Sequence, residues 1–180
     1  LHWSAAHPQP GLPLALGGVG MTLEELTTLY AGIATGGRLA PLRLGPDDPE
    51  ESGQPLLSNT ACWYLSEILR SAPPPQNLPT ASSLARPRAL AYKTGTSYGF
   101  RDAWALGFDD DYTVGVWVGR PDGSPSPGHY GRNTAAPLLF RIFDLLPEQA
   151  IRPPLAPPPG VLQVSREQLP ERLRYFHPNR

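Results

Sequence analysis

Three neighbouring segments between residues 89 and 119 constrain the fold more than any other part of the sequence. Residues 89–96, 100–108 and 112–119 are rich in aromatic, β-branched and small side chains, which predicts three consecutive strands. The run Tyr-Thr-Val-Gly-Val-Trp-Val at 112–118 is the strongest strand pattern in the chain. The Asp-Asp-Asp run at 109–111 predicts a tight turn before it, because aspartate tolerates turn geometry. Strands joined in this way pair antiparallel.

Helical spacing of apolar residues flanks these strands. Thr22 and Glu25 fit a capping box, in which a hydroxyl and a carboxylate each bind a free backbone amide. Pro137 is compatible with a helix over 134–146, because it falls in the first turn of that helix. The expected elements are helices over 22–36, 58–70 and 134–146, a short strand over 39–44 and loops over 1–15, 45–57, 71–88 and 121–132. The predicted class is α+β, an antiparallel sheet flanked by helices.

Proline content suggests how the chain is divided. Its 24 prolines and 18 glycines stay just below the roughly 25–30% typical of unstructured sequence, and an apolar share of 40% suffices for one core. Eight prolines lie at or after Pro147, and five of them fall between residues 152 and 160. We expect one domain over 1–147 and a proline-rich linker over 148–180, leading toward a module outside the chain.

Composition also excludes several classes of function. A net charge of −1 without a basic patch argues against nucleic-acid binding. The single cysteine, Cys62, allows neither an internal disulfide nor a cysteine-based metal site. The four histidines (2, 7, 129 and 177) are scattered, so no zinc site and no cofactor are expected. No apolar run approaches the roughly 18 residues of a membrane span.

The strongest candidate for chemistry is Lys93-Thr94-Gly95-Thr96-Ser97, at the end of a predicted strand. A strand edge offers backbone amides in a fixed line, and Gly95 lets a substrate approach that backbone closely. Lys93 supplies a positive charge, and the threonine hydroxyls can bind a carboxylate. The pattern suits an anionic substrate beside a reacting carbonyl. Taken alone, such a motif is more often an exposed strand end with a solvated lysine.

The surrounding residues extend this motif. The segment Tyr-Lys-Thr-Gly-Thr-Ser-Tyr-Gly-Phe-Arg-Asp-Ala-Trp at 92–104, with Gly-Phe at 107–108 and Val-Gly-Val-Trp-Val-Gly at 114–119, closely resembles the transpeptidase domain of class A penicillin-binding proteins. The nearest likeness is to the 1C type, and the similarity spans roughly residues 11–147. It implies the C-terminal part of a β-lactamase/transpeptidase-like fold, binding peptidoglycan stem peptides and β-lactams.

The resemblance also implies roles for the motif residues. Lys93 and Thr96 would be catalytic, with the lysine in the proton network around the nucleophile and the Thr96 amide as one oxyanion donor. Substrate binding would fall to Thr94, Gly95, Thr96 and Ser97. The two threonines would hold a carboxylate, Gly95 would keep the strand clear, and Ser97 would give a supporting hydrogen bond.

Two further motifs of this family are missing. A Ser-x-x-Lys nucleophile needs a lysine three residues after a serine, but Lys93 is the only lysine and position 90 is Leu90. The Ser-x-Asn motif is also absent, and Ser58 fits a helix cap instead. The chain is therefore expected to be the C-terminal part of a transpeptidase domain, inactive alone, dependent on the rest of that domain and poorly soluble without it.

The implied parent is a membrane-anchored, periplasmic D,D-transpeptidase that cross-links peptidoglycan and carries a separate glycosyltransferase domain. A D,D-carboxypeptidase or β-lactamase-type hydrolase on the same fold remains an alternative, as does a non-catalytic interaction module.

Several other residues have two interpretations. Arg101 is expected to pair with Asp102 rather than to contact substrate, and Trp104 and Trp117 to pack across strands. The glycines at 17–20 suit a tight turn better than a phosphate loop, because no lysine follows them. The run at 109–111 lacks the spacing of a calcium loop.

Overall fold

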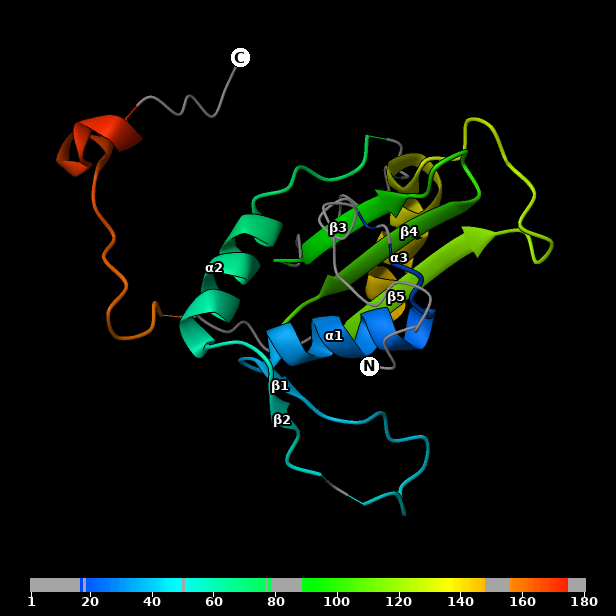
Figure 1. The fold of residues 1–180 in the computed structure, drawn as a ribbon, viewed down its shortest axis with the longest axis horizontal. Coiled ribbons are helices and arrows are strands. Elements are labelled where there is room, and N and C mark those ends of the chain that lie inside the picture. The colour runs from blue at the N-terminus through cyan, green and yellow to red at the C-terminus, as the bar shows by residue number, and fades with distance from the viewer. Residues whose placement is uncertain are drawn as a thin grey trace.

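The computed structural model describes residues 17, 19–49, 51–76, 78, 89–147 and 156–174. At its centre is an antiparallel sheet in the order β3 (Ala91–Thr96), β4 (Asp102–Phe108) and β5 (Thr113–Gly119) (Figure 1). Helices α1 (Leu23–Ala34) and α2 (Asn59–Arg70) precede it, and α3 (Ala136–Leu145) follows it. The predicted α+β class and the three strands predicted between residues 89 and 119 are confirmed, with strand starts shifted by one or two residues.

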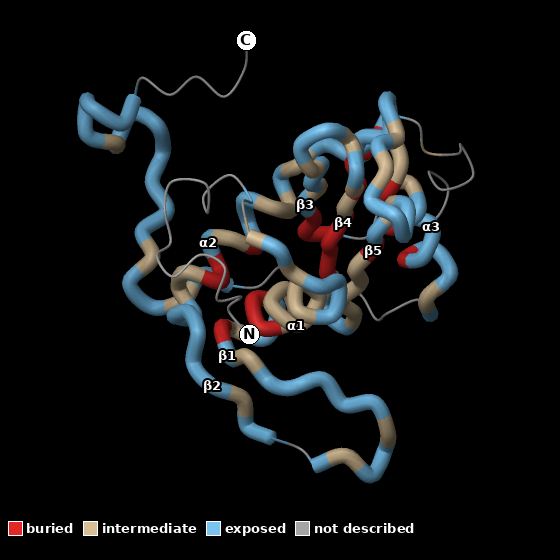
Figure 2. Tube along the Cα trace, turned by 45° about the vertical axis from the view of Figure 1, so that its right-hand side comes forward, coloured by how far each residue is buried: buried red, intermediate tan, exposed pale blue. Residues whose placement is uncertain are grey.

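The sheet buries an apolar layer on each face. Tyr92, Ala105 and Val116 face α3, where they pack against Leu139 and Phe143. On the other face Phe108 and Ala91 form one buried cluster with Ile33 of α1 and Cys62 of α2. In Figure 1, α1 lies in front of the sheet and α3 behind it, and Figure 2 shows the buried residues concentrated between these layers. Alternation along the strands thus supplies both halves of the core.

Side-chain caps fix the beginnings of the first two helices, as expected. The Glu25 amide donates to Thr22 Oγ1 at 3.1 Å, and the Thr22 amide donates to Glu25 Oε2 at 2.9 Å, which completes a capping box. Ser58 Oγ accepts the Ala61 amide at 3.2 Å. At the end of α1, Gly37 adopts a φ of 97° and donates its amide to Gly32. A positive φ there favours glycine.

The strand predicted over 39–44 is wrong in both bounds. The structure has only the two-residue β1 (Arg38–Leu39), paired antiparallel with β2 (Gln54–Pro55) from a segment predicted to be a loop. Arg38 explains this pairing, because its Nε and Nη2 donate to the carbonyls of Ser52 and Gly53 at 2.8 and 2.7 Å. Pro41 lacks an N–H, so the ladder cannot continue through it.

The helical segment predicted over 134–146 also begins earlier than expected. A π-helical turn, η3 (Gly131–Ala135), runs directly into α3 and replaces the predicted start at residue 134. Pro137 lies in the first turn of α3, as expected. The Gly131 amide donates to the Thr96 side chain of β3, and this long-range contact explains why the helical segment begins at residue 131.

The last described segment contains two short 3₁₀ helices, η4 (Arg166–Gln168) and η5 (Glu171–Leu173). The Arg174 guanidinium joins them by donating to the carbonyls of Leu169 and Glu167 at 2.6 and 2.7 Å. Much of the predicted linker, at 148–155 and 175–180, lies outside the described residues, as do residues 1–16, which include His2 and His7. The domain boundary stays a prediction. None of the described helices has the length and apolar character of a membrane span.

Candidate functional site at the end of β3

The motif residues Lys93-Thr94-Gly95-Thr96 are the last four residues of β3, at one edge of the sheet. The strand begins buried at Ala91 and Tyr92, then becomes exposed at Lys93, Gly95 and Thr96. β3 pairs with β4 on one side, and in the described part of the chain no strand pairs on its other side. The motif therefore presents a strand edge to solvent.

The backbone of both threonines faces this open edge. The Ser97 amide donates to the Asp102 carbonyl at 3.0 Å, which orients Ser97 toward β4. In an antiparallel ladder, successive residues direct their N–H and C=O groups to opposite sides. Thr96 and Thr94 therefore direct theirs away from β4. An extended ligand can bind there as an additional strand.

The side chains divide between the two faces of the sheet. Thr94 and Thr96 share the α3 face with Tyr92, whereas Lys93 lies on the face of α1 and α2 with Ala91. The Lys93 ammonium donates to the Thr94 carbonyl at 2.7 Å, which keeps it beside the open edge. An ammonium carries three donors, so this one bond does not exhaust them.

Thr96 is hydrogen-bonded to Gly131, the first residue of η3. Its Oγ1 accepts the Gly131 amide at 3.0 Å in a half-buried hydrogen bond that joins residues 35 positions apart. Gly131 itself is buried, and a Cβ on it would overlap the Gly95 carbonyl oxygen and lie 2.7 Å from the Trp104 carbonyl oxygen. Gly131 is thus packed directly on the backbone of β3 and β4. Sequence reasoning missed this contact.

The turn after the motif is held from two sides. Ser97 Oγ accepts the Asp102 amide at 2.9 Å, which ties the two ends of the turn together. Phe100 adopts a φ of 57°, a strained value for a bulky residue. Its ring meets Tyr130 edge-on at 5.1 Å, and its carbonyl accepts the Ser126 amide at 2.9 Å. These contacts attach the 121–130 loop to the site.

The expected ion pair between Arg101 and Asp102 is wrong. Asp102 Oδ1 instead accepts the indole N–H of Trp117 at 2.9 Å. Asp102 lies opposite Gly119, so Trp117 is its diagonal neighbour on the same face of the sheet. The predicted cross-strand packing of Trp104 with Trp117 is confirmed, at a ring separation of 6.3 Å.

Two other titratable side chains near the sheet, Tyr92 and Cys62, have pKa values that burial shifts. Burial raises the pKa of the Tyr92 phenol, an effect that the nearby charge of Arg132 opposes, and its hydroxyl donates to the Pro73 carbonyl. Burial likewise raises the pKa of the Cys62 thiol, which disfavours the nucleophilic thiolate. Among the described residues, no group of three acidic, histidine or cysteine side chains is placed to hold a metal ion.

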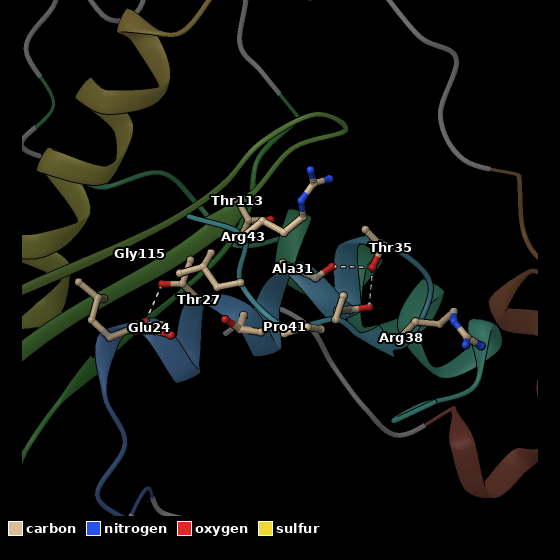
Figure 3. A pocket seen from close by; sticks show the side chains of 14 residues that line it. Glu24, Thr27, Ala31, Thr35, Arg38, Pro41, Arg43, Thr113 and Gly115 are labelled. Carbon is tan, nitrogen blue, oxygen red and sulfur yellow. Dashed lines mark hydrogen bonds between the residues drawn. The ribbon is translucent and has the colours of Figure 1, made fainter. Parts of the chain in front are cut away.

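Figure 3 shows a separate cavity of about 740 Å³. It is lined chiefly by α1, by the segment 40–43 and by Thr113 and Gly115 of β5. Because β5 and β3 are the two outer strands of the sheet, this cavity and the motif lie at opposite edges. It contributes none of the predicted site residues.

No family model matches the sequence, but the chain is similar to known penicillin-binding proteins. The chain is 44% identical over 151 residues to penicillin-binding protein 1C of Escherichia coli K12, an alignment of 84% of this chain and 19% of that protein. It is 32% identical over 77 residues to penicillin-binding protein 1A of Pseudomonas aeruginosa, covering 42% of this chain and 9% of that protein. The chain thus spans about a fifth or less of these relatives.

The fold has a counterpart among solved structures. The crystal structure of penicillin-binding protein 1A from Haemophilus influenzae superposes with a TM-score of 0.59 at 19% sequence identity. The superposition covers 81% of this chain and 29% of that one. At this level of identity the match supports the fold, in agreement with the predicted architecture.

Proposed function

Because this chain is homologous to part of the class A penicillin-binding proteins, we propose that it forms the C-terminal part of a peptidoglycan D,D-transpeptidase domain. The observation that carries the proposal is the position of Lys93–Thr96 at an open sheet edge, in a chain 44% identical to a penicillin-binding protein. The reaction is acyl transfer. A serine attacks the penultimate D-Ala carbonyl of one stem peptide, the terminal D-Ala leaves, and an amine of a second stem accepts the acyl group.

The strand edge suits the binding and oxyanion parts of this reaction. The Thr96 amide faces the open edge and can serve as one oxyanion donor. Removal of one such donor typically slows acyl transfer by about 10²–10³. The hydroxyls of Thr96, an exposed residue, and of Thr94, a half-buried one, suit the carboxylate of a stem peptide or a β-lactam. Gly95 places no side chain between that ligand and the strand.

Lys93 supplies the positive charge of the site. Its ammonium lies at the open edge, 2.7 Å from the Thr94 carbonyl, and keeps further donors for a second partner. We assign it to the proton network of the serine and to attraction of the substrate carboxylate. A cation next to a hydroxyl favours the loss of its proton, which is what a serine nucleophile requires.

The nucleophile itself must come from another part of a longer protein. Within these 180 residues Leu90 stands where a Ser-x-x-Lys motif would need serine, and no second lysine exists. The relatives extend well beyond the length matched here. We therefore propose that the complete protein acts in the periplasm, anchored in the inner membrane and with a separate glycosyltransferase domain.

Covalent labelling of the full-length protein with a fluorescent penicillin tests this function. A transpeptidase is expected to form a long-lived acyl-enzyme that unlabelled β-lactam prevents and that heat-denatured protein does not form. Fast loss of the label would favour a β-lactamase or carboxypeptidase on the same fold. No label on natively folded protein would contradict an acyl-serine enzyme and favour an interaction module.

A further inference from the structure

We propose that Gly131 is a positioning residue of this active site. Its amide directs the hydroxyl of Thr96 so that the hydroxyl proton is presented to the carboxylate of the acyl-donor substrate. This inference rests on the proposed function and deepens it, because it names what aligns one of the substrate-binding groups.

The hydrogen bond between the two residues fixes the direction of the hydroxyl. The Gly131 N–H donates to Thr96 Oγ1 at 3.0 Å, so it occupies one of the two lone pairs of that oxygen. The hydroxyl proton then has to point elsewhere. In the described part of the chain it has no acceptor, and Thr96 is exposed. An anion arriving at the strand edge therefore meets a donor that is already oriented.

The close packing of Gly131 accounts for the choice of glycine at this position. Gly131 is not among the residues with positive φ, so backbone conformation alone does not require glycine. The lack of space requires glycine, because a Cβ would overlap the carbonyl oxygen of Gly95 and approach that of Trp104 to 2.7 Å. These are backbone atoms of two paired strands, which cannot yield as a flexible side chain can. An alanine at this position must displace the amide from Thr96.

The helix that carries Gly131 is firmly attached to the sheet. η3 continues into α3, and Ala135, Ala136 and Leu139 are completely buried against β3 and β4. π-helical turns are rare and occur frequently at functional sites. Beside it, Tyr130 contacts Phe100 of the turn after the motif. The Gly131 amide is therefore held in a fixed position relative to Thr96.

The test compares acylation of the full-length protein by benzylpenicillin and by its methyl ester, which lacks the charged carboxylate. The unsubstituted protein is expected to prefer the free acid. Gly131→Ala is expected to reduce this preference by about tenfold, the effect of one charge-assisted hydrogen bond. Thr96→Val is expected to do the same, Thr96→Ser to retain the preference, and Gly131→Ala combined with Thr96→Val to add little.

Gly20→Ala is the matched control, because a Cβ at Gly20 meets no atom within 4 Å and its backbone is not left-handed. It is expected to leave the preference unchanged. Equal slowing of both compounds by Gly131→Ala, with the preference intact, would overturn the inference and leave the proposed function standing. Absence of acylation in the unsubstituted protein would overturn both.

Hydrogen exchange supplies a second measurement that does not depend on the folding of Gly131→Ala. The Gly131 amide is expected to be protected in the unsubstituted protein, to stay protected after acylation by benzylpenicillin and to exchange faster in Thr96→Val. Loss of its protection on acylation would contradict the inference, because the carboxylate would then replace the amide rather than accept the hydroxyl proton.

Discussion

Replacement of Lys93 by alanine in the full-length protein is expected to abolish labelling by penicillin. Lys93 is the only lysine of the chain, and its ammonium lies at the open edge beside the Thr94 carbonyl. Its removal takes away the charge to which we assign attraction of the carboxylate and support of proton transfer. Proton-transfer groups typically contribute about 10²–10⁴ in rate, so we expect the acylation rate constant to fall by at least about 10³.

Two variants accompany this measurement, which follows the growth of fluorescent label with time. Lys93→Arg keeps the charge but changes the shape and donor geometry of the group, so it is expected to recover only a small part of the rate. Arg141→Ala removes an exposed cation from α3 and is expected to label normally. Labelling of Lys93→Ala at the unsubstituted rate would contradict the role assigned to the motif.

Phe108→Ala is expected to lower the free energy of unfolding by about 3–5 kcal/mol, the usual cost of removing a large buried ring. Phe108 is 1% exposed at the end of β4. Its ring meets Tyr30 of α1 at 6.4 Å, and it shares a buried cluster with Cys62 of α2. The loss therefore affects the layer that joins both helices to the sheet.

Denaturant unfolding of the full-length protein, followed by the transition that includes this domain, measures the effect. Tyr98→Ala is the matched control, since Tyr98 is an aromatic residue in the turn after the motif and is 100% exposed. It is expected to change the stability by less than about 0.5 kcal/mol. A cost below about 1 kcal/mol for Phe108→Ala would show that this layer of the core is not formed as described.

The sheet was predictable because its determinants are local. Alternating side chains and the Asp-Asp-Asp turn at 109–111 specify β4 and β5 without reference to the rest of the chain. The capping box at Thr22 and the side-chain cap at Ser58 are local too. The strand predicted over 39–44 fails because the pairing of β1 depends on Arg38 reaching carbonyls 14 and 15 residues away.

The candidate site was predictable as a motif, but its supports were not. Lys93–Thr96 stands at a strand edge as expected, and Ser97 closes the following turn. The bond from Gly131 to Thr96 depends on how α3 packs on the sheet, which no sequence spacing encodes. For the same reason Asp102 binds Trp117 and not the adjacent Arg101, since its partner is chosen by the register of β4 and β5.

We propose that this chain supplies the substrate and oxyanion strand while another part of the protein supplies the nucleophile. Mass spectrometry of peptides from the penicillin-labelled full-length protein tests it most directly. We expect one penicilloyl group, on a serine that is followed three residues later by lysine and lies outside these 180 residues. A penicilloyl group on a serine within this chain, or no modified serine at all, would contradict it.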